Sequence, residues 1–246
     1  MISASHNDEK WNALKLLNSN GEFLHPEEVQ KVIKETKRTQ SNKEKPGNLS
    51  SYANALGDHI NLILSQNFIN KNNIASKSIA VAVDGINSVG GVAIPKFLES
   101  LGIKKIKKIN CNPDGNFNHN PEPLPENITD LCSEVKSGKY QLGIVVDPDA
   151  DRLVLVDERG EPFGEEYTLV AAAEYLLSKN HGASTCSNLS STLALKNITE
   201  KYGGKYFSSA VGEINVVQVM KEKKCLIGGE GNGCLLYTSD AADEGL

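Results

Sequence analysis

Residues 79–84 read Ile79-Ala80-Val81-Ala82-Val83-Asp84, and the glycines Gly85, Gly90 and Gly91 follow. An unbroken apolar run of this length predicts a strand that is buried on both faces, as in a parallel sheet. A helix is predicted from the glycines to residue 101 and a second strand over 106–110, which together make a β-α-β unit. The predicted fold class is therefore α/β.

The glycines after this strand also suggest a phosphate-binding turn. The segment has neither G-x-G-x-x-G nor G-x-x-x-x-G-K, the patterns typical of dinucleotide and nucleotide sites. Right-handed packing of a helix against its strands accounts for the glycines without a ligand. We therefore interpret them as packing residues.

The same alternation continues downstream and predicts a second unit of the same kind, although no repeat of residues is visible. A long loop is predicted over 112–126. Further helices are predicted over 128–137, 166–177, 192–202 and 213–223, and further strands over 141–146, 153–156, 183–189, 206–211 and 225–228.

Upstream of residue 78 the pattern is less regular. Residues 11–17 are predicted to form a strand that a turn closes into a hairpin with residues 22–24. The other expected segments are helices over 26–38 and 52–68, an exposed loop over 39–51 and a linker over 70–78.

The composition is that of a globular chain. Of the 246 residues 39% are hydrophobic and 23% are charged, and the net charge is −5, which argues against disorder. No apolar run reaches the roughly 18 residues of a membrane span, and the basic residues are scattered, so neither a membrane nor a nucleic acid is expected as a partner. Five cysteines without a C-x-x-C pair or a secretory signal indicate reduced thiols and a cytoplasmic location.

The most informative segment follows the predicted strand 141–146 and reads Asp147-Pro148-Asp149-Ala150-Asp151-Arg152. Three carboxylates at alternate positions of a tight turn converge on one point, which is costly unless a cation neutralises them. We interpret the turn as a Mg²⁺ site that keeps positions open for a phosphate oxygen. A plain acidic surface turn is the alternative, because Asp is a favoured turn residue.

The spacing of these acids also matches an EF-hand loop, with Asp147, Asp149, Asp151 and Glu158 at its first, third, fifth and twelfth places. The sixth place of an EF-hand needs glycine for a sharp turn, and Arg152 stands there. The flanking segments are predicted strands rather than helices, so we reject the EF-hand.

Two further segments are candidates for chemistry. Ser3-Ala4-Ser5-His6-Asn7 places a hydroxyl beside an imidazole, although such short polar residues are also typical of a plain turn. Gly228-Gly229-Glu230-Gly231-Asn232-Gly233 lets the backbone approach a ligand closely, and its Glu230 and Asn232 suit the vicinal hydroxyls of a sugar. A structural glycine-rich turn is the alternative for the second segment.

Together these three segments resemble the α-D-phosphohexomutase family, which includes phosphoglucomutase/phosphomannomutase and phosphoglucosamine mutase. Residues 3–7 are similar to its active-serine loop (T/S)-A-S-H-N-P, residues 147–152 to its metal loop D-(G/P)-D-A-D-R, and residues 229–233 to its sugar-binding loop G-E-x-(S/N)-G. The resemblance spans residues 1–233 and implies consecutive α/β/α sandwich domains.

The resemblance also implies roles for individual residues. Ser5 would carry the transferable phosphoryl group as a phosphoserine, primed by a hexose 1,6-bisphosphate, and Lys15 would be the general acid/base. The implied ligands of Mg²⁺ are Asp147, Asp149, Asp151 and an oxygen of the phosphorylated Ser5. The implied contacts to the hydroxyls of a phosphosugar substrate are Glu230 and Asn232.

Charge balance agrees with these roles. A phosphoserine of about −2 beside three aspartates needs compensating charge, so we expect Mg²⁺, Lys15, Arg152 and a protonated His6 near Ser5. The alternative for His6 is a turn histidine packed against its own loop, and the alternative for Lys15 is a solvated lysine on a strand.

The predicted function is thus an intramolecular phosphotransferase that interconverts the 1- and 6-phosphates of a hexose or hexosamine. One alternative is a non-catalytic α/β protein that binds Mg²⁺ or sugar phosphates, with Ser5 in a structural turn. Another is a phosphatase with an aspartyl nucleophile in the 147–152 loop, which would leave Ser5 and Glu230 without a role. The residues do not discriminate among glucose, mannose and glucosamine phosphates, and they indicate no oligomeric state.

The resemblance also predicts an incomplete chain that would not turn over substrate alone. The expected parts are the end of a first domain (1–72), a second domain (73–180) and part of a third (181–233). The family has about a hundred residues before the serine and a fourth domain that clamps the substrate phosphate, in chains of about 400 residues, so Met1 is expected to be internal. Asp8 stands where the family has proline, which loosens the serine loop. Residues 234–246 are similar to a translated sequencing adapter and are expected to be a non-native tail, with an ordinary acidic terminus as the alternative.

Overall fold

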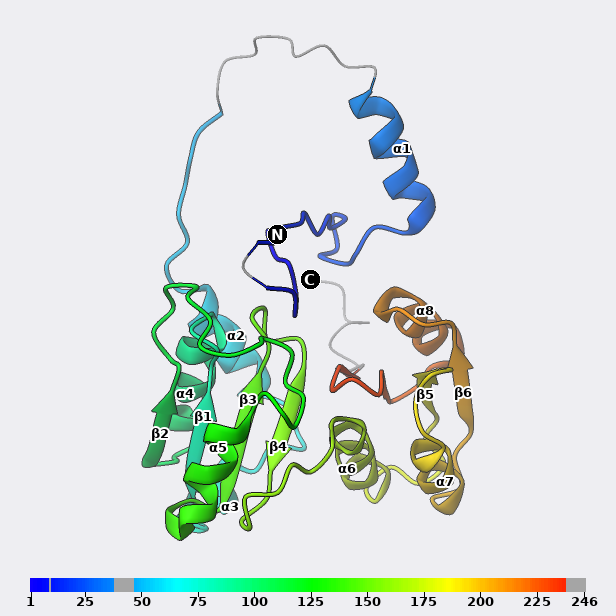
Figure 1. The fold of residues 1–246 in the computed structure, drawn as a ribbon. Helices are drawn as coiled ribbons and strands as arrows, with labels where there is room; N and C mark the ends of the chain where they lie inside the picture. The colour runs from blue at the N-terminus through cyan, green and yellow to red at the C-terminus, as the bar shows by residue number, and fades with distance from the viewer. Residues whose placement is uncertain (9, 38–46, 238–246) are drawn as a thin grey trace.

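The computed structural model describes residues 1–8, 10–37 and 47–237 and shows two α/β units with one sheet each (Figure 1). The described helices are α1 (Pro26–Thr36), α2 (Ala55–Leu64), α3 (Lys71–Ser76), α4 (Gly90–Ser100), α5 (Thr129–Glu134) with the π-helical turn η1 (Val135–Lys139), α6 (Glu165–Leu177), α7 (Ala194–Lys201) and α8 (Glu213–Lys223). The described strands are β1 (Ala80–Asp84), β2 (Lys105–Ile109), β3 (Leu142–Val146), β4 (Leu153–Val156), β5 (Thr185–Asn188), β6 (Tyr206–Ser209), β7 (Ile227–Gly229) and β8 (Leu235–Tyr237).

The first sheet has the strand order β2-β1-β3-β4. Strand β1 is parallel to β2 and β3, and β4 closes the edge antiparallel to β3. Every residue of β1 is buried, because successive side chains point to opposite faces and helices cover both. Val81 and Val83 pack with Leu98 of α4, and Ala82 packs with Leu131 of α5. The α/β prediction from this strand is confirmed.

The second sheet repeats this topology in the order β6-β5-β7-β8. Strand β5 is parallel to β6 and β7, and β8 pairs antiparallel with β7. The two units are therefore siblings in fold, as predicted. An important consequence is that the loop after β3 and the loop after β7 occupy equivalent places.

Helix α6 packs into the core of the second unit. Its Leu169 and Leu177 share one buried cluster with Leu195 of α7 and Ile227 of β7. We therefore propose that the boundary between the second and third domains lies before α6 rather than at residue 180.

The glycines after β1 allow close packing of the backbone. A Cβ on Gly85 would lie 2.3 Å from Gly91 Cα, and a Cβ on Gly91 would lie 2.6 Å from Cys111 Cα. Any side chain would push α4 away from the turn that follows β1. The interpretation of these glycines as packing residues is confirmed.

The strand predicted over residues 11–17 is wrong. In the described residues this segment makes only single bridges, Ile2 with Leu14 and Leu17 with Phe23, and Trp11 is 67% exposed. A regular strand needs a partner along its whole length, which the short segments beside it do not provide. The apolar residues of the segment alone did not reveal this.

The linker expected over 70–78 contains α3, whose first turn is capped by the Asn70 side chain accepting from the N–H of Asn73. The asparagines that suggested a linker thus include a helix cap. Residues 39–46 of the predicted loop and residues 238–246 of the predicted tail lie outside the described residues. Among the described residues, no helix combines the length and apolar character needed to cross a lipid bilayer.

The N-terminal segment forms ion pairs with both units; Figure 1 draws it, in blue, above the two sheets. Lys15 forms an ion pair with Asp149 of the first unit, while Glu22 forms an ion pair with Lys221 of α8 in the second. This arrangement brings the serine loop at residues 3–7 to the loop that follows β3.

Candidate functional site

Two loops from equivalent places in the two sheets meet at the site. The segments that resemble the family's metal loop (147–152) and sugar-binding loop (229–233) are called here the metal loop and the sugar loop. The metal loop follows β3, and the sugar loop begins at the last residue of β7. Arg152 forms an antiparallel bridge with Cys234, and the N–H of Leu153 donates to Gly233 O over 3.1 Å. Gly233 has φ +86°, and a Cβ there would lie 2.8 Å from Leu153 O, so this contact requires glycine.

The backbone of the metal loop folds around Asp147, which is fully buried. Its Oδ1 accepts the N–H groups of Asp151 and Arg152, each over 3.1 Å. Ala150 adopts φ +59°, which lets the chain turn back toward β4. Ser88, before α4, donates its hydroxyl to Pro148 O over 2.6 Å. The metal loop is thus stabilised by its own carboxylate Asp147 and by the Ser88 hydroxyl from the neighbouring turn.

The three aspartates of this loop can reach one cation. Asp147, Asp149 and Asp151 each offer a carboxylate oxygen, and these oxygens lie within 4.8 Å of one another. Asp147 Oδ2 and Asp149 Oδ1 are buried and have no hydrogen-bond partner among the described residues, an arrangement that is costly for a carboxylate. Since oxygen ligands are those that Mg²⁺ prefers, the donor set fits this ion.

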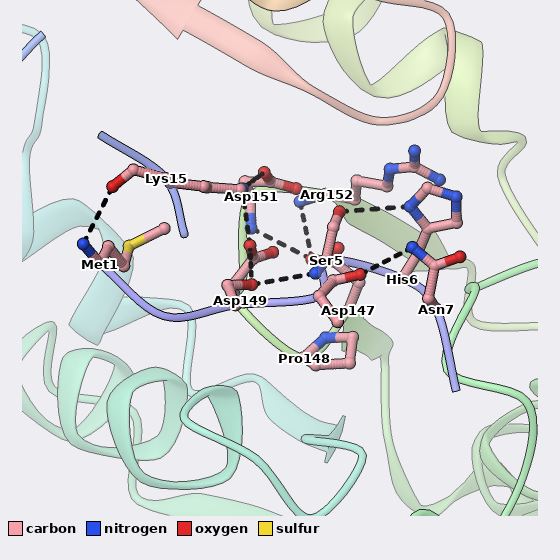
Figure 2. A network of polar contacts seen from close by, with 12 residues as sticks. Met1, Ser5, His6, Asn7, Lys15, Asp147, Pro148, Asp149, Asp151 and Arg152 are labelled. Carbon is pink, nitrogen blue, oxygen red and sulfur yellow. Dashed lines mark hydrogen bonds and ion pairs between the residues drawn. The ribbon is translucent and has the colours of Figure 1, made fainter. Parts of the chain in front are cut away.

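The serine loop and Lys15 dock on these carboxylates (Figure 2). Ser3 Oγ donates to Asp149 Oδ2 over 2.5 Å, and Lys15 Nζ donates to the same oxygen over 2.7 Å. Lys15 Nζ also lies 3.1 Å from Asp151 Oδ2. The two carboxylate oxygens of Asp149 therefore have different surroundings. Oδ2 accepts hydrogen bonds from the N-terminal segment, while Oδ1 has no partner among the described residues and can bind another ligand.

Burial and charge shift the ionisation of these groups in opposite directions. Burial, together with the charge of Asp151, raises the pKa of Asp147 to about 7. Burial also acts to raise the pKa of Asp149, but the hydrogen bonds from Lys15 and Ser3 outweigh it and hold that pKa below its usual value. Burial lowers the pKa of Lys15, yet its bonds to Asp149 and Asp151 raise the pKa overall. Lys15 is consequently a cation at neutral pH.

Ser5 sits in a strained turn beside a cavity. It has φ +52°, which is uncommon for a residue with a side chain, and its N–H donates to Ser3 Oγ over 2.9 Å. Ser5 Oγ lies 3.2 Å from His6 Nδ1. An open cavity of about 570 Å³ adjoins Ser5 and is lined also by Trp11 and Asp149. Ser5 therefore lines the same cavity as Asp149 of the metal loop.

The side chain of Arg152 turns away from the aspartates. Its Nη1 pairs with Glu122 Oε1 over 3.0 Å, and Glu122 belongs to the long loop 112–126. That loop is anchored by His119, whose Nε2 lies 3.1 Å from Oδ2 of the fully buried Asp84. Arg152 thus donates its backbone N–H to Asp147, while its guanidinium group forms an ion pair with Glu122.

The sugar loop holds Glu230 in a dense hydrogen-bond network. Glu230 Oε1 accepts from Asn188 Nδ2 and from the N–H of Gly212, each over 2.7 Å. Glu230 Oε2 receives a longer contact, 3.3 Å, from Asn232 Nδ2. Glu213, the first residue of α8, is half-buried, and burial and the charge of Asp151 raise its pKa.

The structure brings together Ser5, His6, Lys15 and the three aspartates, and it places Glu230 and Asn232 on the adjoining loop. Sequence reasoning missed the contributions of Ser3, Glu122, Asn188 and Gly212. Ser3 was already visible as the hydroxyl position of the serine motif, and Asn188 as a polar residue near the end of the predicted strand 183–189. The pairing of Glu122 with Arg152 had no signal in the sequence.

Comparisons with known proteins agree with this architecture. The models of phosphoglucomutase/phosphomannomutase alpha/beta/alpha domains I, II and III match residues 1–43, 57–160 and 164–246. A phosphoglucomutase/phosphomannomutase of Thermococcus kodakarensis is 30% identical over 241 residues, which cover 96% of this chain and 52% of the relative. The chain spans about half the length of the curated relatives it matches.

Two solved structures share the fold. A phosphoglucomutase/phosphomannomutase family protein from Burkholderia thailandensis has a TM-score of 0.80 at 24% identity, covering 96% of this chain and 50% of that one. Aspergillus fumigatus N-acetylphosphoglucosamine mutase, in complex with GlcNAc-6P and magnesium, has a TM-score of 0.60 at 15% identity, covering 98% and 61%. Because matches to three consecutive domains cover most of its residues, the chain belongs to the phosphoglucomutase/phosphomannomutase family.

Proposed function

We propose that this chain is part of a phosphohexomutase that moves a phosphoryl group between the 1 and 6 positions of a hexose or hexosamine. The route is a phosphoserine at Ser5 and a bisphosphorylated sugar. The observation that carries the proposal is the docking of the serine loop on the metal loop, where Ser3 and Lys15 both bond Asp149 Oδ2. A structural turn at Ser5 would not need its neighbour Ser3 to bond a carboxylate of this convergent set.

Asp147, Asp149 and Asp151 are the proposed ligands of Mg²⁺, together with a phosphate oxygen on Ser5. The buried oxygens of Asp147 and Asp149 that lack a hydrogen-bond partner in the described part of the chain support this assignment, as does the magnesium in the A. fumigatus structure. The bound ion would neutralise charge on the transferring phosphoryl group.

The chain's own residues supply positioning and protons. In the proposed step the phosphorus bond to Ser5 Oγ breaks while a bond forms to the free hydroxyl of the sugar. The proton of that hydroxyl passes to solvent, and Lys15 donates a proton to Ser5 Oγ; the reverse step returns both. The bonds of Lys15 to Asp149 and Asp151 raise its pKa, so its ammonium group is charged beside the proposed phosphate.

Glu230 and Asn232 are the proposed contacts to sugar hydroxyls. Their loop is joined to the metal loop by the bond from Leu153 N to Gly233 O, so a sugar on it would lie near the phosphoryl donor. The GlcNAc-6P in the A. fumigatus structure supports a phosphosugar as substrate.

The test is transfer of label to Ser5. The 246-residue chain is incubated with Mg²⁺ and glucose 1,6-bisphosphate labelled in its phosphates, and the labelled peptide is mapped. We expect label on the Ser5 peptide of the wild-type chain and none in Ser5→Ala. Binding of the bisphosphate without any labelling would instead identify a non-catalytic sugar-phosphate-binding protein.

Turnover is a separate question, because the chain spans about half the length of its relatives. We propose that this polypeptide alone does not sustain it; a mutase rate that Ser5→Ala abolishes would contradict this. Assays of a full-length parent with glucose, mannose and glucosamine phosphates would identify the substrate. A cytoplasmic location stays a prediction from the cysteines.

A further inference from the structure

Asn188 ends β5 beside the sugar loop and is 2% exposed. Its Nδ2 donates to Glu230 Oε1 over 2.7 Å. On the basis of the proposed function, we infer that Asn188 is a positioning residue that orients Glu230 toward the sugar hydroxyls. No motif in the sequence marks Asn188 as functional.

The orientation of the Asn188 amide is determined by its surroundings. A carboxylate such as Glu230 only accepts hydrogen bonds, so the amide must present its nitrogen to it. The hydroxyls of Ser190 and Ser191 donate to Asn188 Oδ1 over 3.0 and 2.7 Å. Donors on one side and an acceptor on the other therefore exclude a flipped amide.

The contacts of Glu230 leave one of its oxygens for a ligand. Oε1 is bound twice, by Asn188 Nδ2 and by the N–H of Gly212, while Oε2 has the longer contact with Asn232. A sugar hydroxyl that donates to a carboxylate would form its bond with Oε2. Rotation of Glu230 away from this position would leave the buried Asn188 amide without its acceptor.

The sister sheet suggests the most informative substitution. Asp84 ends β1 as Asn188 ends β5, and there the carboxylate accepts from His119 and from Asn110. Asn188→Asp would put an aspartate at the end of β5, as at the end of β1, but there its neighbour is the carboxylate of Glu230. The change keeps the volume of the side chain, removes the donor to Glu230 and adds a like charge.

The experiment measures binding of glucose 6-phosphate to the 246-residue chain by calorimetry, with Mg²⁺ binding titrated separately. We expect Asn188→Asp to lower the affinity for glucose 6-phosphate by about tenfold or more and to leave the affinity for Mg²⁺ unchanged. Asn197→Asp, on the exposed face of α7, adds the same charge elsewhere and serves as the matched control. Lowering the pH should restore binding to Asn188→Asp relative to wild type, because the two facing carboxylates can then share a proton. Glu213, which also faces Glu230, is the same in both proteins.

The outcomes separate the two proposals. A wild-type chain that binds no glucose 6-phosphate contradicts this inference, while the labelling of Ser5 tests the proposed function separately. Equal binding by wild type and Asn188→Asp contradicts the inference alone. If Asn188→Asp does not fold, the double variant Ser190→Ala/Ser191→Ala tests the inference instead. It removes the two hydrogen bonds that fix the Asn188 amide, so we expect about threefold weaker binding of glucose 6-phosphate. Wild-type affinity in this variant would contradict the role of Asn188.

Discussion

Ser3 Oγ donates a hydrogen bond of 2.5 Å to Asp149 Oδ2 across 146 residues of chain. The same hydroxyl accepts the N–H of Ser5 over 2.9 Å. One side chain thus connects the backbone of the proposed phosphoserine to a proposed metal ligand. Through this link the geometry of the serine loop depends on that of the metal loop, and the reverse.

Ser3→Ala should weaken Mg²⁺ binding, because Asp149 loses the bond that directs its Oδ1 toward the cation. Loss of a group that orients a metal ligand typically costs about tenfold in affinity, which calorimetry of the 246-residue chain can measure. Ser3→Thr keeps the hydroxyl and should bind like wild type. Wild-type affinity in Ser3→Ala would show that the bond does not orient Asp149.

Lys15→Met should make the protein less stable without Mg²⁺ and more responsive to it. The ammonium group neutralises Asp149 and Asp151, and without it their charges repel one another and attract a cation more strongly. We expect about tenfold tighter Mg²⁺ binding and a larger rise of Tm on adding the ion. The control is Lys10→Met, at an exposed position of the same segment; weaker Mg²⁺ binding by Lys15→Met would refute the prediction.

The ion pair between His119 and Asp84 should make stability depend on pH. Burial lowers the pKa of His119, but its hydrogen bonds to Asp84 and to the carbonyl of Asn120 outweigh burial and raise it above 6.5. A histidine whose pKa is raised by folding stabilises the protein fully below its unfolded pKa, and this contribution is lost as the pH rises through the folded pKa.

His119→Asn should therefore cost about 1 to 3 kcal/mol at about pH 6 and clearly less at about pH 9, as measured by urea unfolding. Asp84 and Asp130 are the acidic groups that act on this ring. His59→Asn, on the exposed side of α2, is the control and should show no such trend. A difference between wild type and His119→Asn that does not change with pH would rule out the charged pair.

Gly91→Ala should destabilise the first unit through packing alone. The added Cβ would lie 2.6 Å from Cys111 Cα, so α4 or the loop after β2 must move, and overpacking of this kind costs about 1 to 3 kcal/mol. Gly47→Ala, where a Cβ meets no atom of the described residues within 4 Å, is the matched control. Equal midpoints in urea for both variants would show that the turn can absorb a methyl group.

Most strands and helices could be predicted because their signals are local. Strand β4 (Leu153–Val156) and helix α8 (Glu213–Lys223) lie where the apolar pattern placed them. The strand predicted at residues 11–17 failed because pairing depends on partners elsewhere in the chain. Helix α3 was missed because six residues are too few for a helical period to stand out.

The sequence by itself determined the α/β alternation and the residues of the serine, metal and sugar loops, since side-chain periodicity and turn chemistry are properties of short segments. Only the tertiary structure decided which of these residues share an environment. It assigned Ser3 and Lys15 to one oxygen of Asp149, turned Arg152 to Glu122 and placed Asn188 behind Glu230. Such pairings depend on how the two sheets and the N-terminal segment pack together. Only that packing buries the carboxylate of Asp149 and gives its Oδ2, but not its Oδ1, hydrogen-bond donors.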